Sequence, residues 1–255
     1  MANFKGFVKV LTVSTVGLTL LAGAESANAQ SFLPQEEGEV ELTNLICLTG
    51  DCIAPKGFTI TSLDYSQDLP DDANYGVSRF FMDSKGTAND YGFGIKFKAD
   101  DAGTNPHSSE IYWGRPVAFD KDGNAIENGE LEVGRFLFTF DEKVSLDLSF
   151  LDVEESKGAF SSILKVNGND FNQSLPAGAD DNIQNVSLTN VKSFEVQLGN
   201  PGINSDITKF QKTGDGVNIQ VAAKTPEPAA TFSFAALAVA GMFGVAKRRK
   251  STKHA

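Results

Sequence analysis

The chain has 255 residues, 41% of them hydrophobic, and its 22 basic against 33 acidic side chains give a net charge of −11. This composition suits one globular domain with extensions, and it excludes collagen-like and fully disordered chains. Residues 30–224 hold 15 basic and 31 acidic side chains, a net charge of −16 that repels phosphate backbones and argues against nucleic acid as a partner.

The first 29 residues have the pattern of a secretory signal. Lys5 and Lys9 precede an uncharged apolar stretch at 10–24, and the small residues Ala27 and Ala29 follow at the −3 and −1 positions of a cleavage site. We therefore expect export by the Sec machinery, with cleavage after Ala29. An uncleaved anchor helix is the alternative, although 15 apolar residues are few for a membrane span.

Residues 30–45 are rich in acid and poor in apolar side chains. The acidic residues are Glu36, Glu37, Glu39 and Glu41. This composition predicts a flexible acidic entry into the domain, or an edge strand.

Cys47 and Cys52 are the only cysteines, and they enclose four residues. In an exported protein this spacing predicts a disulfide that closes a small loop. Its stabilisation should be modest, because so short a loop has little closure entropy to remove.

Short runs of alternating apolar and polar residues, separated by Gly, Asn, Asp and Pro, fill the rest of the domain. The clearest are Phe93, Ile95 and Phe97; Val144, Leu146, Leu148 and Phe150; Phe194, Val196 and Leu198; and Val217, Ile219 and Val221. Alternation with period two is typical of half-buried strands. Residues 46–223 are therefore predicted to form an all-β domain, an antiparallel β-sandwich of jelly-roll type.

Trp113, the only Trp of the chain, follows Tyr112 in one of the predicted strands. Adjacent strand residues point to opposite faces, so at most one of the two rings can stack on a sugar. Packing of Trp113 in the core is the simpler interpretation, and a glycan platform is the alternative.

Two acidic stretches are candidate calcium sites, since calcium takes oxygen ligands. Residues 120–124 resemble the start of a calcium loop, but Leu131 stands where a bidentate acid is expected, so we interpret them as a turn. Asp152 and Glu154 continue the inward-facing phase of the preceding strand, and they are either solvated at the rim of the sandwich or share a calcium ion. The single imidazole of the body, His107, leaves zinc and nucleophilic chemistry short of residues.

Between Leu131 and Phe140 the apolar residues change from odd to even positions. An extra residue at Gly134 or Arg135 would restore one buried face, which predicts a β-bulge. Residues 141–143 are then predicted to turn the chain, so that 131–141 and 144–152 form a hairpin.

The C-terminal region, 224–255, contains three parts in a fixed order. Pro226, Glu227 and Pro228 precede an uncharged span at 229–246, and a basic tail at 247–255 begins with the cluster Lys247, Arg248, Arg249 and Lys250. Eighteen helical residues measure about 27 Å, close to the hydrocarbon thickness of a bilayer. We expect a transmembrane helix with its basic end in the cytoplasm and the acidic domain exported; a buried Ala-rich helix is the alternative.

The order of tripeptide, span and basic cluster resembles the PEP-CTERM sorting signal. The resemblance implies recognition by a membrane-embedded exosortase and cleavage near the tripeptide. After an inner-membrane intermediate, it implies transfer to the cell surface or extracellular matrix of a Gram-negative-type cell.

A second resemblance lies in the domain itself. Leu131-Glu132-Val133-Gly134, together with the stretches at 198–202 and 213–217, is similar to a cyanobacterial-type family of PEP-CTERM proteins named for a Leu-Glu-Val-Gly signature. This similarity supports the location and the fold, and it carries no activity.

The sequence thus favours a non-enzymatic exported protein of the cell surface or matrix, with exopolysaccharide or calcium as candidate ligands. The alternative is a secreted polysaccharide hydrolase in which Asp152 acts together with Glu154 or Glu155.

Overall fold

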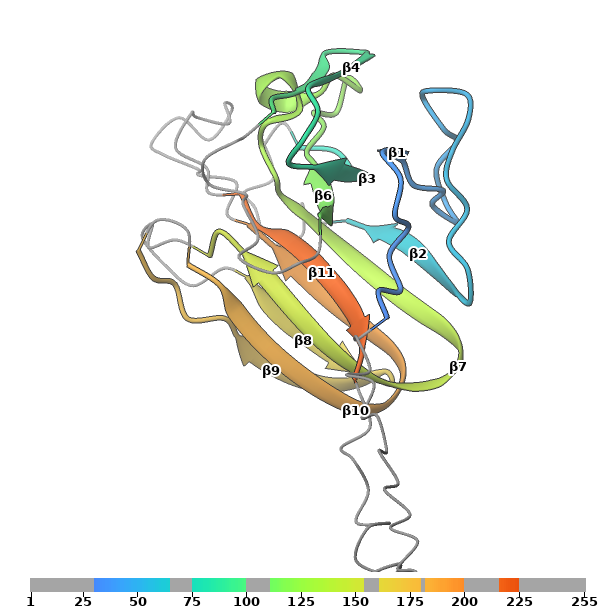
Figure 1. Cartoon of the computed structure of the whole chain (residues 1–255), viewed down its shortest axis with the longest axis vertical. Coiled ribbons are helices and arrows are strands. Elements are labelled where there is room, and N and C mark those ends of the chain that lie inside the picture. Colours follow the sequence, from blue (N-terminus) through green and yellow to red (C-terminus); the bar gives the residue numbers. More distant parts are fainter. Residues whose placement is uncertain are drawn as a thin grey trace, which may run out of the picture.

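The computed structural model describes residues 30–64, 75–99, 111–153, 161–179, 182–199 and 216–224. These residues form an all-β structure whose named strands all pair antiparallel, with one short 3-10 helix, η2 (Ile126–Gly129) (Figure 1). The predicted all-β, antiparallel fold is confirmed, and the arrangement is consistent with a β-sandwich; the jelly-roll type stays a prediction.

The strands are short except for two. In chain order they are β1 (Gly38–Glu39), β2 (Phe58–Leu63), β3 (Arg79–Ser84), β4 (Asn89–Gly92), β5 (Ile95–Phe97), β6 (Tyr112–Val117), β7 (Gly134–Leu151), β8 (Ser162–Val166), β9 (Asn169–Ser174), β10 (Gln184–Leu198) and β11 (Asn218–Ala223).

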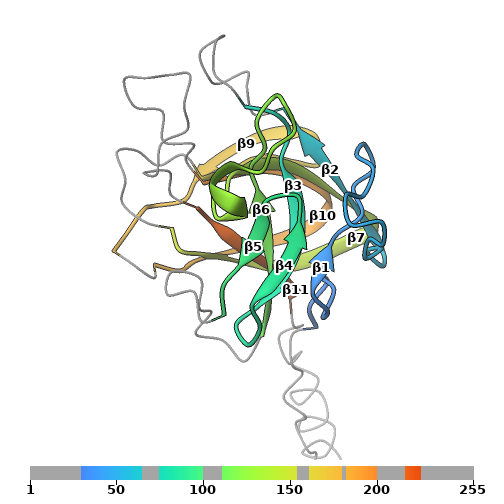
Figure 2. The ribbon, with the colours of Figure 1, turned by 90° about the horizontal axis from the view of Figure 1, so that it is seen from above.

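Strand β7 organises the main sheet. It pairs with β10 along one edge, while its other edge pairs with β2 through residues 135–140 and with β11 through residues 146–151. From β11 the sheet continues through β6 and β3 to β1, and from β10 it continues through β8 to β9. The long strands curve, so that the sheet wraps around the core (Figures 1 and 2).

The predicted hairpin is wrong, because β7 runs as one strand of 18 residues through 141–143. The ladder is interrupted there, since Val144 pairs with Val191 whereas Thr139 pairs with Ser193. The side chains at 141–143 are exposed, and the shift of register marks a bend in one continuous strand instead of a reversal of the chain. The apolar phase is even on both sides of the bend, and this pattern fits a continuous strand as well as a hairpin.

The bulge predicted at Gly134 or Arg135 is also wrong. Strand β7 begins at Gly134, and the Val133 N–H donates to the Leu131 carbonyl at 3.0 Å, so residues 131–133 form a tight turn before the strand. Glycine is needed at 134 for close packing, because a Cβ there would overlap the ring of Phe136. The change of the apolar residues from odd to even positions therefore marks the start of β7, not a bulge within it.

The apolar residues of three of the four runs are buried as predicted, although in the run 217–221 the intervening Asn218 and Gln220 are buried too, so that strand is not half-exposed. Nine apolar residues of the three runs are at most 2% exposed: Leu146, Leu148, Phe150, Phe194, Val196, Leu198, Val217, Ile219 and Val221. In the fourth run Ile95 and Phe97 are buried, but Phe93 is 60% exposed. Phe93 and Gly94 have φ of 51° and 74° and form the turn between β4 and β5, so the prediction of Phe93 as an inward strand residue is wrong.

A small second layer covers part of the sheet. The β4–β5 hairpin lies over β3 and β6 (Figure 2), and a separate apolar cluster fills the space: Phe81, Ile95, Phe97, Val117 and Phe119. Phe80 and Met82 of β3 face the main core instead. Strand β3 is thus buried on both faces, which explains its continuous apolar run without alternation.

The N-terminal segment is packed against the domain, not a flexible entry. Leu33, Val40 and Leu42 are at most 4% exposed and belong to the main core. Strand β1 pairs with β3 at the end of the sheet path, which is the edge-strand alternative. Burial of these three apolar side chains outweighs the acidic composition of the segment.

The start of this segment lies beside the last strand. The Phe32 N–H donates to the Val221 carbonyl at 2.8 Å, and the Ala223 N–H donates to the Gln30 carbonyl at 2.8 Å. The first and last described stretches of the chain therefore leave the domain next to each other.

Candidate functional site

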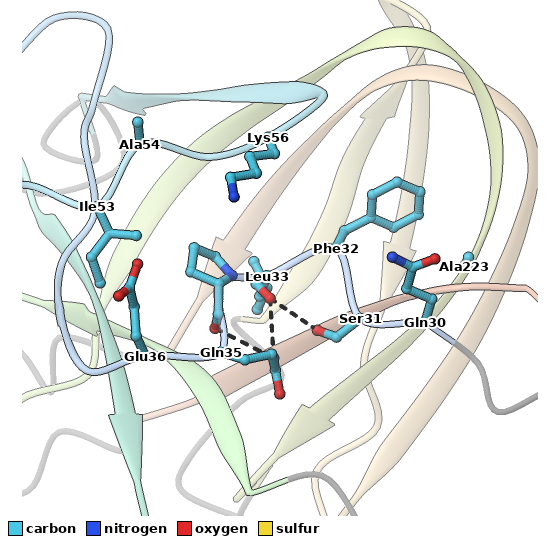
Figure 3. Close-up of a pocket in the computed structure, with 11 residues that line it drawn as sticks. Gln30, Ser31, Phe32, Leu33, Gln35, Glu36, Ile53, Ala54, Lys56 and Ala223 are labelled. Atoms are coloured by element: carbon cyan, nitrogen blue, oxygen red, sulfur yellow. Dashed lines mark hydrogen bonds between the residues drawn. The ribbon is translucent and has the colours of Figure 1, made fainter.

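A pocket of about 440 Å³ opens between the N-terminal segment and the loop before β2 (Figure 3). Its lining consists of residues 30–36, Ile53, Ala54, Lys56 and Ala223. The walls combine apolar side chains with amides, a hydroxyl, a carboxylate and an ammonium group. A concave site of this size with a few polar groups is typical of small-molecule binding.

Local hydrogen bonds shape one wall of the pocket. The Gln35 side-chain amide donates to the carbonyls of Leu33 and Pro34 at 3.0 and 3.3 Å, and the Ser31 hydroxyl donates to the Leu33 carbonyl at 3.3 Å (Figure 3). The Phe32 ring meets the ring of Phe140 edge-on, with 5.3 Å between centroids. The wall is therefore tied to the core and is largely pre-formed.

Two opposite charges line the pocket without neutralising each other. The side chain of Lys56 extends into it, and the carboxylate of Glu36 lies near Ile53 (Figure 3). Neither forms an ion pair with any residue that the structure describes. Both charged groups are thus available to a ligand.

The predicted disulfide between Cys47 and Cys52 is confirmed. The loop that it closes is held by Glu39, which is 1% exposed. One carboxylate oxygen of Glu39 accepts hydrogen bonds from the N–H groups of residues 48 and 49 at 2.7 and 3.0 Å, and the other pairs with Arg79. A buried carboxylate with these partners fixes the loop to the sheet edge.

Replacement of both cysteines by serine should lower the free energy of unfolding by about 2 kcal/mol, because a loop of this length removes little chain entropy from the unfolded state. Urea denaturation followed by fluorescence measures the loss. A reductant should lower the stability of the wild type to that of the double variant and leave the variant unchanged. An equal effect of the reductant on both proteins would contradict the prediction.

A buried charge cluster lies between β3, β6 and the turn before β7. Arg115 is fully buried; its guanidinium donates to Asp83 at 2.8 Å and also pairs with Glu132. The guanidinium carbon lies 4.3 Å from the centroid of the Phe97 ring. Burial raises the pKa of Asp83 above its usual value, and the neighbouring Arg115 only partly opposes that rise.

This cluster gives the Leu-Glu-Val-Gly segment a structural role. The Glu132 side chain pairs with Arg115, and its carbonyl accepts a hydrogen bond from the Val217 N–H at 3.0 Å. The Val133 carbonyl accepts one from the Ser78 hydroxyl at 2.6 Å. These contacts join the segment to β6, β11 and the start of β3, so its residues hold the fold together.

The interpretation of residues 120–124 as a turn is confirmed. One carboxylate oxygen of Asp120 accepts from the N–H groups of Asp122 and Asn124 at 3.0 and 2.8 Å, and Gly123 has φ of 82°. Burial raises the pKa of Asp120, but the hydrogen bonds outweigh it and hold the pKa below its usual value.

Replacement of Asp120 by Ala should cost about 1 kcal/mol at pH 7, since the turn loses its acceptor. Because the folded-state pKa is lowered, the ionised carboxylate stabilises the protein above the ordinary pKa of about 4, and this contribution is lost as the pH falls through the folded-state value. The gap between wild type and Asp120→Ala in thermal unfolding should therefore narrow at pH 3. Asp120→Asn, which keeps an acceptor oxygen, should lose less; a gap that is constant with pH would contradict the argument.

Trp113 is 2% exposed and lies in the interior. A sugar stacks on an exposed ring face, so the favoured interpretation, packing of Trp113 in the core, agrees with its burial and the alternative of a glycan platform at Trp113 is wrong. Its cross-strand partner is Asp83 of the charge cluster.

Asp152 follows β7 in a left-handed conformation, with φ of 65°, and is half-buried. Glu154, its predicted calcium partner, lies outside the described residues, as do Glu155 and His107. Within the described ranges, no three His, Cys, Asp or Glu side chains gather as metal ligands. The calcium pair stays a prediction.

The predicted delivery segments also lie outside the described residues. They are the signal at 1–29 with Ala27 and Ala29, the motif at 226–228, the span at 229–246 and the cluster at 247–250. In the part of the chain that the structure describes, no helix has the length and apolarity needed to cross a membrane.

Sequence reasoning missed both the pocket and the charge cluster. The sequence did contain a pattern that points to the charge cluster: Arg115 stands at an inward-facing strand position between Trp113 and Val117, and a buried Arg needs acidic partners. No local sequence pattern points to the pocket, since its lining comes from three separate parts of the chain.

Comparisons of the chain with protein-family models, with curated proteins and with solved structures find no match. Its function must therefore be argued from its own residues.

Proposed function

We propose that the chain is an exported, non-enzymatic protein of the cell surface or extracellular matrix, delivered by a C-terminal PEP-CTERM-like signal that an exosortase recognises. The observation that carries the proposal is the hydrogen bond of 2.8 Å between Ala223 and Gln30. These residues adjoin the two predicted delivery segments, at 1–29 and 224–255.

Adjacent chain exits suit a domain held at a membrane during delivery. Gln30 and Ala223 lie at the end of β11, whereas the β4–β5 hairpin lies at the opposite end of the domain (Figure 1). With both exits toward the membrane, the opposite end faces outward. Neither predicted membrane segment then needs to cross the surface of the domain.

Two further observations support an exported domain. The disulfide between Cys47 and Cys52 is a feature of oxidising compartments. A net charge of −16 in residues 30–224 favours solubility outside the cell and disfavours binding to phosphate backbones.

The test is the intact mass of the protein recovered from the surface or medium of producing cells. We expect a chain that begins at Gln30 and ends near 226–228. Replacing Pro226, Glu227 and Pro228 together by Ala should keep the unprocessed C-terminus in the membrane fraction. Glu41→Gln, which removes an exposed acid elsewhere, should be processed like the wild type.

Two outcomes would contradict the proposal. A surface protein that still ends at Ala255 would be a permanent single-pass anchor, and an unprocessed chain in the cytosol would show that neither segment directs export.

A further inference from the structure

We infer that the pocket between residues 30–36 and Lys56 binds a carboxylate-bearing sugar residue, with the Lys56 ammonium as counter-ion to the carboxylate (Figure 3). The inference rests on the proposed function for its setting, since an exported protein meets surface polysaccharide. Its chemistry comes from the pocket alone.

The position of Lys56 is the first step. Residues 30–224 contain about twice as many acids as bases, and three other lysines pair with carboxylates: Lys96 with Asp90 at 3.0 Å, Lys98 with Glu130 at 2.7 Å and Lys165 with Glu195 at 3.1 Å. Lys56 has no such partner among the described residues and extends into a pocket instead. Lys85 and Lys143 are likewise exposed and without an ion pair among the described residues, but they do not line the pocket. Lys56 is therefore the cation placed to attract an external anion into it.

The presence of Glu36 in the pocket limits which anions can bind there. Its carboxylate lines the same pocket, so a dianion such as phosphate meets repulsion as well as attraction. A monoanion that also carries hydroxyl groups fits better, because a carboxylate accepts strong hydrogen bonds from hydroxyl donors. A uronic acid has both features in one ring.

The remaining walls suit a sugar ring. Phe32, Pro34 and Ile53 are partly exposed and offer apolar contact to the C–H face of a pyranose, and the side chains of Gln30 and Ser31 bring polar groups to the rim. At about 440 Å³ the pocket has room for a hexose-sized ring.

Titration calorimetry on the full chain, purified in mild detergent, tests the inference with glucuronate as probe and glucose as its neutral counterpart. We expect glucuronate to bind at least tenfold more tightly than glucose and more tightly than inorganic phosphate. Lys56→Gln should weaken glucuronate binding about tenfold or more, whereas Lys56→Arg should retain most of it. Lys96→Gln, at an exposed lysine outside the pocket, should leave it unchanged.

Equal binding of glucuronate and glucose by the wild type would overturn the inference, as would unchanged binding by Lys56→Gln with a native circular dichroism spectrum. The termini and location of Lys56→Gln are measured separately, and both should match the wild type. If the chain binds glucuronate but is not exported, the proposed function is wrong and the pocket assignment stands. If the chain is delivered correctly but does not bind glucuronate, the pocket assignment is wrong and the proposed function stands.

Discussion

Replacement of Arg115 by Met should leave the protein largely unfolded at neutral pH. The variant keeps Asp83 and Glu132 almost fully buried, with both carboxylates deprived of the guanidinium that pairs with them. Removing one partner from a buried ion pair costs about 3–5 kcal/mol, and here two acids lose the same partner. Such a loss is comparable with the whole stability of many domains of this size. Chemical denaturation measures it.

The pH dependence of the variant separates loss of charge from loss of packing. Burial already raises the pKa of Asp83 in the folded state, so its protonated form is favoured there and its ionised form destabilises the fold as the pH rises through the folded-state value. Without Arg115 the pKa of Asp83 in the folded state should be raised further. Arg115→Met should therefore regain stability relative to the wild type between pH 7 and pH 5.

If Arg115→Met does not fold, a second variant tests whether the unpaired buried carboxylates cause the loss of stability. The triple variant Arg115→Met, Asp83→Asn, Glu132→Gln removes all three charges and should be more stable than Arg115→Met alone. Equal stability of the two variants, or a loss in Arg115→Met that does not change with pH, would show that the guanidinium acts only through packing.

Replacement of Phe138 by Ala should cost about 3–5 kcal/mol, the range for deleting a large buried aromatic side chain. The ring of Phe138 is fully buried and stacks on Phe194, with 4.7 Å between centroids. It also contacts the rings of Phe58 and Phe80, so its loss opens a cavity bordered by three strands. Urea denaturation gives the difference in unfolding free energy.

Phe171→Ala is the matched control, because Phe171 is 44% exposed on β9. Its effect should stay within about 0.5 kcal/mol, as for most surface substitutions. Similar losses in the two variants would mean that the rings of the main core contribute no more than an exposed ring.

Local patterns predicted the local features of this fold. Alternation in 144–150, 194–198 and 217–221 identified buried strand faces, the spacing of Cys47 and Cys52 identified the disulfide, and the polar stretch 120–124, with Leu131 in place of a calcium-binding acid, was interpreted correctly as a turn. Each of these depends on residues close together in the sequence, where geometry leaves few choices.

The failures concern partners that are distant in the sequence. The hairpin predicted around 141–143 does not form, because β7 pairs along most of its length with β10, some fifty residues later, and on its other edge with β2 and β11. Period-two alternation states which face is buried and contains nothing about which strand lies beside it. The pocket was missed for the same reason, since Lys56 meets residues 30–36 only after the segment beginning at Gln30 pairs with β11.

Strand β11 is the last strand among the described residues, yet it lies inside the main sheet and pairs with both β6 and β7. Until residues 218–223 have been synthesised, the edge of β6 that pairs with β11 has no partner strand. The hydrogen bond between Ala223 and Gln30 cannot form before then either. Long-range pairing of this kind forms late, because the closure entropy of the intervening chain must first be overcome. The domain should therefore complete its fold only after residues 218–223 have been synthesised. This order of events suits the export proposed above, because a chain that is still incompletely folded can pass through a translocation channel.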